Sequence, residues 1–231
     1  MRAVTLESLR TQARQRADFE ASPTSTSFVP DAELTGYINN SIAELYDLII
    51  EANGDQYYAF SAPPFSTVAG IEEYDLPEDF YRLVGVDALV GGFKQTVHLF
   101  PLGERNRFQA LTAPGWFRGG RLYYRLRVES IVFAPVPDGG YTITLLYIPN
   151  PTILVDDEDT FNFHGGWEEY VIVDAAIKMQ LKEETDTSVL QLAKEQLKNR
   201  IRGAAPQRDD GEPQVVTDVT RGDYDGDYYL Y

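Results

Sequence analysis

The sequence predicts an α+β fold: helices from both ends of the chain form a four-helix bundle, and an antiparallel β-sandwich or barrel is inserted between them. An extended C-terminal arm follows. Apolar residues near both ends recur at the i, i+3, i+4, i+7 spacing of one helix face. The middle changes to short alternating segments separated by Gly-Gly turns, which is typical of an antiparallel sheet. The last residues show neither period, so the predicted boundaries are 1–54 and 165–203 for the bundle, 55–164 for the inserted β-domain, and 204–231 for the arm.

Composition and charge exclude several classes of function. The chain has 231 residues, 43% of them apolar, which suits a folded protein with a sizeable core. The absence of cysteine excludes disulfides and thiolate metal sites. A formal net charge of −16 argues against binding nucleic acid by phosphate neutralisation, and indicates either solubility or an acidic surface past which DNA slides without sticking. No segment resembles a signal peptide or a membrane-spanning helix, so we expect a soluble, non-exported chain that contacts no membrane.

Two helices are predicted near the N-terminus. The first covers Thr5–Phe19, where the apolar residues form a single stripe. The second covers Asp31–Ala52, and the rest of the fold is expected to organise around it. Pro30 suits the first helical position, and Asn53-Gly54 supplies a left-handed stop. The apolar face of this second helix consists of Leu34, Tyr37, Ile38, Ile42, Leu45, Leu48 and Ile49.

The second helix has a weak intrinsic tendency to form. Gly36 and the run Asn39-Asn40-Ser41 are poor helix formers, so packing against other elements must hold it. It therefore needs partners elsewhere in the chain.

Residues 55–164 are predicted to be mainly short strands. Extended segments are expected at 56–68, 72–76, 81–90, 94–99, 116–118, 121–126, 128–134 and 141–148. Gly91-Gly92 and Gly119-Gly120 are hairpin signals, and Asp138-Gly139-Gly140 is expected to join the last two strands in a tight turn. A short helix is predicted over Leu102–Leu111. Pro149–Phe163 is predicted to be a loop that carries an acidic run.

Two further helices are predicted after the β-domain. Trp167–Glu184 is apolar nearly all round at its centre, which indicates burial between two partners. Thr185-Asp186-Thr187-Ser188 is a capping sequence, and Val189–Arg202 forms the last helix. The arm that follows has no period and no core-sized apolar set, yet it ends in aromatic residues that are costly to leave in water. It is typical of a segment that becomes ordered on a partner.

No pattern indicates a catalytic, cofactor-binding or metal site. His98 and His164 lie in separate segments, and the sequence has no HExxH, no Gly-rich phosphate loop and no GxSxG. The Asp-rich stretch Asp223–Asp227 fails the spacing of an EF-hand loop. A carboxylate pair for glycoside hydrolysis stays open, because such pairs meet in space rather than in sequence. We expect a protein that is not an enzyme and needs no cofactor.

The ordered features resemble the head-to-tail adaptor (connector or neck) proteins of tailed bacteriophages. The resemblance covers nearly the whole chain in the same order and rests on structural rather than catalytic motifs. It is carried by a leading LxxLR helix, AELTGYINNSIAELY over 32–46, YDLPEDFYRL over 74–83, APVP over 134–137, YIPNP over 147–151 and WEEYVIVDAA over 167–176.

The resemblance implies a ring, usually of twelve copies, fixed beneath the portal at the capsid vertex in the virion neck, after assembly in the host cytoplasm. The helical bundle would build the ring wall, and the β-domain would face a downstream neck or tail protein such as a nozzle or terminator. Packaged DNA would pass through the lumen without specific binding. The second helix then becomes a candidate ring wall, with Asn39-Asn40-Ser41 near a neighbour or the lumen, although a role in the subunit core is the simpler expectation.

The resemblance also implies that the C-terminal arm docks on the portal. The candidate docking residues are Arg208, Val215, Val216, Tyr224, Tyr228, Tyr229, Leu230 and Tyr231. The alternative that stays open is a peptidoglycan or glycan hydrolase, or a carbohydrate-binding module, of a phage tail.

Overall fold

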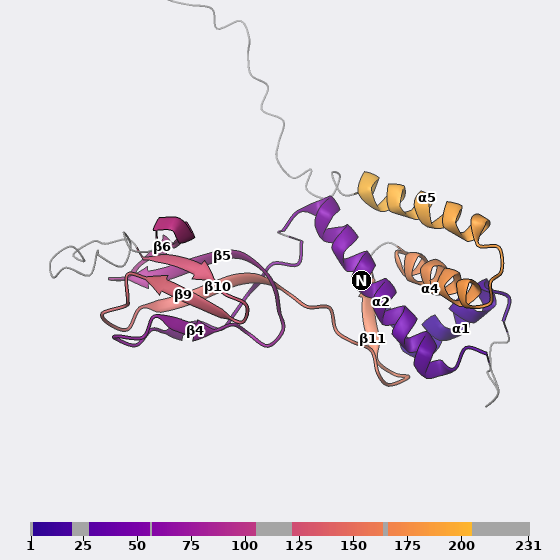
Figure 1. Cartoon of the computed structure of the whole chain (residues 1–231), viewed down its shortest axis with the longest axis horizontal. Helices are drawn as coiled ribbons and strands as arrows, with labels where there is room; N and C mark the ends of the chain where they lie inside the picture. The colour runs from indigo at the N-terminus through magenta and orange to yellow at the C-terminus, as the bar shows by residue number, and fades with distance from the viewer. Residues whose placement is uncertain (1, 20–27, 56, 105–121, 164–165, 205–231) are drawn as a thin grey trace, which may run out of the picture.

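The fold is mixed α+β, as predicted. In the computed structural model the described residues are 2–19, 28–55, 57–104, 122–163 and 166–204. Helices gather at one end of the molecule and most strands at the other (Figure 1). The last turns of the long second helix and the chain that follows it lead from the helical end into the β-strands.

Four helices are described in the helical part. They are α1 (Leu6–Arg16), α2 (Asp31–Asn53), α4 (Glu168–Lys182) and α5 (Ser188–Ala204). Helix α4 packs against all three others, and ten of its fifteen residues are buried. The prediction that this helix is enclosed by partners is therefore confirmed. The first helix is shorter than the predicted Thr5–Phe19. Thr5 caps its start by accepting a hydrogen bond from Ser8 N, and it ends at Arg16, just before Asp18 takes a φ of 65°.

Local chemistry explains the ends of α2. Pro30 takes the capping position just before the helix, and Gly54 ends it with a φ of 78° while its N–H donates to Ile50 O at 2.9 Å. Inside the helix, the single hydroxyl hydrogen of Ser41 is shared between Tyr37 O, 2.8 Å from Oγ, and Asp174 Oδ2, 2.7 Å from it, so this side chain has its partners inside the fold.

A small sheet ties the N-terminus to the chain that leaves the β-strands. β1 (Arg2–Thr5) pairs antiparallel with β11 (Thr160–Phe163). The prediction that Pro149–Phe163 is entirely loop is therefore wrong at its end. Val4 and Phe163 are buried with the helices, and Leu6 N donates to Asp159 O at 2.9 Å. The pairing partner lies far away in the sequence, so the local pattern of either strand could not reveal it.

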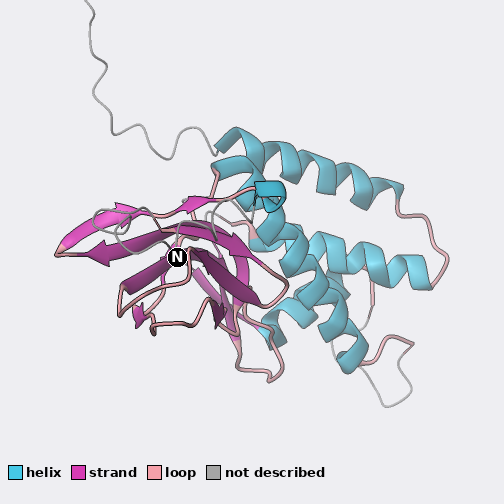
Figure 2. Cartoon of the chain, turned by 60° about the vertical axis from the view of Figure 1, so that its left-hand side comes forward, coloured by secondary structure: helices cyan, strands magenta, loops and turns pink. Residues whose placement is uncertain are grey.

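Two further sheets share one apolar core in the β-part (Figure 2). The first runs in the order β2 (Phe60–Ser61), β10 (Thr142–Pro149), β5 (Phe80–Val90) and β6 (Phe93–Thr96), with β3 (Phe65–Ser66) also on β10. The second runs β4 (Glu73–Asp75), β9 (Ser130–Ala134), β8 (Tyr123–Leu126) and β7 (His98–Leu99). Their ladders are antiparallel except for the parallel pair β7–β8.

Of the two predicted glycine turns that lie in the described residues, only one closes a hairpin. Gly91 and Gly92, with φ of 58° and 85°, close the β5–β6 hairpin as predicted. The tight turn predicted at Asp138-Gly139-Gly140 does not close a hairpin, because β9 and β10 belong to different sheets. The chain instead crosses from one sheet to the other there. Thr67 holds this crossing: its Oγ1 donates to Gly139 O at 2.7 Å and accepts from Tyr141 N at 2.9 Å.

Other predicted elements are only partly described. The strand predicted over 94–99 is split between the two sheets, with Val97 N donating to Val86 O at 2.8 Å between its halves. Of the helix predicted over 102–111, only the short 3₁₀ turn η1 (Leu102–Glu104) falls within the described residues. The segment predicted at 116–118 and the Gly119-Gly120 turn lie outside them.

Candidate assembly site

The apolar face predicted for α2 lies in the core of the subunit. Six of its residues are almost fully buried, and Tyr37 is half-buried with its hydroxyl donating to Glu33 Oε1 at 2.6 Å. The six buried residues are Leu34, Ile38, Ile42, Leu45, Leu48 and Ile49. Their contacts hold α2 to the other helices of its own chain, and a part in a ring wall stays a prediction.

The polar run on α2 has partners within the subunit. Asn39 makes two hydrogen bonds with the backbone of Leu154, donating to its O at 2.9 Å and accepting from its N at 3.0 Å. Ser41 is buried and contacts helix α4. Asn40 alone of the three is exposed.

The arm residues proposed to dock on the portal lie outside the described residues. These are Arg208, Val215, Val216, Tyr224, Tyr228, Tyr229, Leu230 and Tyr231. The described chain ends at α5, whose last residue is Ala204.

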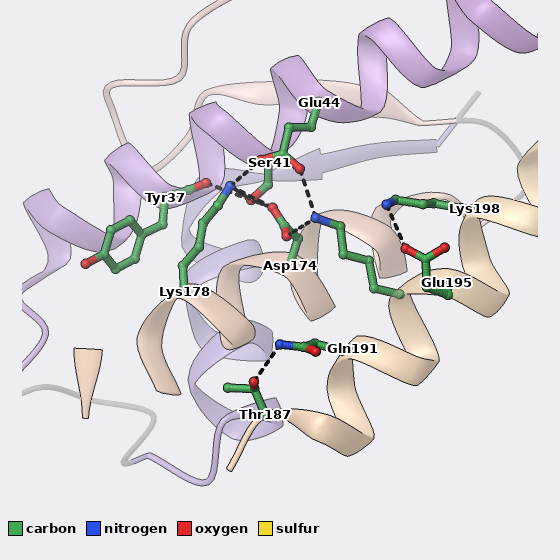
Figure 3. A network of polar contacts seen from close by, with 10 residues as sticks. Tyr37, Ser41, Glu44, Asp174, Lys178, Thr187, Gln191, Glu195 and Lys198 are labelled. Carbon is green, nitrogen blue, oxygen red and sulfur yellow. Dashed lines mark hydrogen bonds and ion pairs between the residues drawn. The ribbon is translucent and has the colours of Figure 1, made fainter. Parts of the chain in front are cut away.

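A charged network joins α2, α4 and α5 where the three helices meet (Figure 3). At its centre the side chain of Asp174 is only 3% exposed. Its carboxylate accepts from Lys178 Nζ at 2.7 Å, Lys194 Nζ at 2.5 Å and Ser41 Oγ at 2.7 Å. A buried carboxylate with three donors is fully satisfied, which is what its burial requires.

Glu44 completes the network on its solvent side. Its two carboxylate oxygens accept from Lys178 at 3.0 Å and Lys194 at 2.9 Å. Lys194 also lies over the ring of Tyr170, 5.4 Å from its centre. The network therefore contains two carboxylates and two ammonium groups, so its formal charges balance.

The electrostatics of the network favour its charged state. Burial pushes the pKa of Asp174 up, but the hydrogen bonds from Lys178, Lys194 and Ser41 outweigh it, and the pKa is lowered. The pKa of Glu44 is lowered in the same way, with burial opposed by Lys194 and Lys178. Burial alone would lower the pKa of Lys194, yet its bonds to Asp174 and Glu44 raise it. The pKa shifts of Asp174, Glu44 and Lys194 thus all favour the charged form of these groups.

No sequence pattern described for this chain predicted the network. A signal was present, because Asp174 is the one charged residue in the otherwise apolar stretch 170–177, and Lys178 follows it at the i+4 position that places the two on one helix face. Such a carboxylate must find a cation or several donors inside the fold. The contribution of Lys194, from a different helix, had no local signal.

A groove lies between α2 and the segments that lead into and out of the β-strands. It has a volume of about 510 Å³. Asn40, Ala43 and Asp47 line it from α2, Tyr81 from the start of β5, and Ile153 from the chain after β10. Tyr46 at its base donates to Pro149 O at 2.7 Å and stacks on Tyr58, which fixes the joint between helices and strands.

The described residues give little support to other kinds of site. Among them, no group of three or more His, Cys, Asp or Glu residues could hold a metal ion. His98 is exposed on β7, and His164 falls outside the described residues. In the described part of the chain, no helix has both the length and the apolar character needed to cross a bilayer.

Comparison with known proteins gives one match. Residues 4–220 match the SU10 adaptor protein family, so the match covers almost the whole chain. A comparison with curated proteins finds no match. The matched residues span all four helices and the strands of the β-part that the structure describes. The chain therefore belongs to the SU10 adaptor protein family, a family of bacteriophage head-to-tail adaptors.

Proposed function

We propose that this protein is a structural adaptor that joins the portal at the capsid vertex to the tail, as a ring of twelve copies in the virion neck. The family match over residues 4–220 is the observation that carries the proposal. The role is structural rather than catalytic. DNA passes through the ring during packaging and ejection, and no specific contact with it is required.

We assign different roles in the ring to the helical part and to the β-part of the subunit. Residues 1–54 and 165–203 form a helical bundle that builds the ring wall, residues 55–164 form an inserted β-domain that faces the next neck or tail protein, and 204–231 form the arm. The clustering of helices at one end and strands at the other supports this division (Figure 1). The net charge of −16 suits a conduit that repels the DNA backbone.

The outer helix α5 supports a role in assembly. Only Ile201 of its residues is fully buried, while Val189 and Leu192 are 76% and 63% exposed. Lys194 nevertheless fixes α5 to Asp174 and Glu44, and Arg202 pairs with Glu51 at 3.2 Å. Because α5 leads directly into the arm, these contacts set the point from which the arm reaches the portal.

Sedimentation of the full-length protein with and without purified portal tests the proposal. We expect the protein to sediment with portal as one complex that contains several adaptor copies for each portal ring. Independent sedimentation of the two proteins at micromolar concentrations would contradict the proposal.

Deleting Tyr224–Tyr231 tests the arm separately. We expect the deletion to weaken portal binding, because a tyrosine-rich end supplies apolar area and hydrogen bonds together. The matched control replaces Asp223, Asp225 and Asp227 by asparagine and keeps the aromatic residues. Portal binding that is unchanged by the deletion would exclude the arm as the docking element.

A further inference from the structure

We propose that the groove between α2 and the β-part receives the arginine-rich segment 105–121 of a neighbouring copy of this chain, as one contact between subunits. The inference rests on the proposed ring and names a pair of surfaces that meet in it. A cyclic ring needs two different, complementary surfaces on each subunit. The groove and segment 105–121 are different parts of one chain.

The groove has the shape and lining of a docking site for a short peptide segment. Its volume of about 510 Å³ is within the range of pockets that bind ligands. The apolar part of its lining comes from Ile42, Ala43, Tyr46 and Ile153. Ile153 is 71% exposed in the isolated chain, so a partner that covers it gains apolar contact.

The rim of the groove is acidic. Asp47, Glu78 and Asp79 line it, and a second hollow of about 390 Å³ shares Glu78 and adds Asp75 and Glu129. None of the described residues that line the groove is lysine or arginine. The described lining of the groove therefore favours a cationic partner.

Two carboxylates of the rim, those of Asp47 and Asp79, contact phenols. Tyr81 donates to Asp47 at 2.5 Å, and Tyr147 donates to Asp79 at 2.7 Å. The hydrogen bond to Asp47 raises the pKa of Tyr81, and burial together with Asp79 raises that of Tyr147 to about 12. The carboxylates of Asp47 and Asp79 are thus each held in place by a neutral donor.

Segment 105–121 has the matching chemistry. It carries no acidic residue, and its sequence, RNRFQALTAPGWFRGGR, contains four arginines. Aromatic residues, among them Trp116 and Phe117, lie beside these arginines and suit the apolar lining. Arginine forms bidentate hydrogen bonds with carboxylates, which gives such a contact direction as well as charge. The C-terminal arm is a poor occupant by comparison, because 205–231 carries seven acidic residues and only two arginines.

Charge reversal tests the contact in the full-length protein. With portal present, the double variant Asp47→Lys, Glu78→Lys is expected to weaken ring formation at least about tenfold, because like charges then meet across the interface. Combining it with Arg105→Glu, Arg118→Glu in the same chain is expected to restore assembly. The matched control Glu158→Lys, Glu183→Lys makes the same change in net charge at exposed positions away from the groove and is expected to assemble normally.

Cysteine cross-linking decides whether the contact is between copies. Because the chain has no cysteine, Asn40→Cys together with Phe117→Cys introduces the only thiols. Oxidised rings are expected to give a ladder of covalently linked chains on a non-reducing gel. Cross-links confined to single chains, or intact rings with no cross-link, would overturn the inference.

The outcomes also separate this inference from the proposed function. If the unchanged protein forms no complex with portal, both fail. If rings form equally well with the charge-reversed groove, only this inference fails. It fails equally if Arg105→Glu, Arg118→Glu leaves assembly intact and instead weakens retention of DNA in the ring.

Discussion

Helices α4 and α5 follow each other in the chain, have similar lengths, and are held in opposite ways. Helix α4 buries ten of its fifteen residues, whereas α5 fully buries one of seventeen. Apolar packing fixes α4, and three of the ionic contacts of α5 reach α2 and α4. The difference indicates that α4 stabilises the subunit, while α5 is an outer layer that is held by these ion pairs together with Leu190, Leu197 and Ile201 and is available for assembly.

The largest loss of stability is expected from replacing Asp174, whose carboxylate joins α4 to α5. Replacing Asp174 by alanine leaves Lys178 and Lys194 to share Glu44 and removes a buried charge partner. We expect a loss of about 3–5 kcal/mol in the free energy of unfolding, measured by urea denaturation. A loss below about 1 kcal/mol would show that the network does not join α5 to the core.

Truncation in α4 tests apolar packing alone. Ile172 is 2% exposed in the helical core, so Ile172→Ala leaves a cavity and is expected to cost about 3 kcal/mol in unfolding free energy. The same denaturation experiment measures it. A near-neutral result would mean that α4 is not the stabilising helix of the pair.

Removing the Lys194 ammonium tests whether α5 is anchored separately from α4. Lys194→Met keeps most of the side-chain stem and deletes the ammonium, while Asp174 retains Lys178 and Ser41 as partners. We expect a loss of about 2 kcal/mol, because hydrogen bonds to charged groups are lost. Hydrogen exchange should accelerate in α5 much more than in α4. Equal acceleration in both helices would contradict the separate anchoring of α5.

Acid should weaken the network. The pKa values of Asp174 and Glu44 are lowered in the folded state, so their contribution is present above the unfolded values of about 3.9 and 4.3 and is lost as pH falls through the lower folded values. Unfolding free energy measured from pH 7 to pH 3 is expected to fall less steeply in Asp174→Asn than in the unchanged protein. Identical slopes would exclude a lowered pKa at Asp174.

The smallest expected effect lies on the outer face of α5. Leu192 is exposed, so Leu192→Ala is expected to change unfolding free energy by less than about 0.5 kcal/mol. The comparable truncation at Ile172 is its control. A large loss of stability at Leu192 would mean that α5 packs against the rest of the subunit with the face that is assigned here to the exterior.

The helices that were predicted correctly are those whose apolar residues recur with a clear helical period. The apolar face of α2 and the all-round apolar centre of α4 are found in the core as expected. The pairing of β1 with β11 escaped prediction because each strand is short and its partner is remote. The crossing at Asp138-Gly139-Gly140 was predicted as a hairpin because glycine turns look alike whether or not the flanking strands share a sheet.

The candidate sites were harder to predict than the elements. Asp174 was visible as an acid in an apolar helix, but its partner Lys194 comes from another helix. The groove is lined by residues of α2, by residues 78–81 at the start of β5 and by residues 150–153 after β10, so no single stretch of the sequence predicts it. The motifs that carry the resemblance predicted the adaptor family, and the family match over residues 4–220 confirms it.

Electron microscopy of the purified full-length protein mixed with portal tests the central claim most directly. The account predicts closed adaptor rings seated on portal rings, with the helical ends of the subunits in the ring wall. Portal rings that stay bare in the presence of excess adaptor would contradict it.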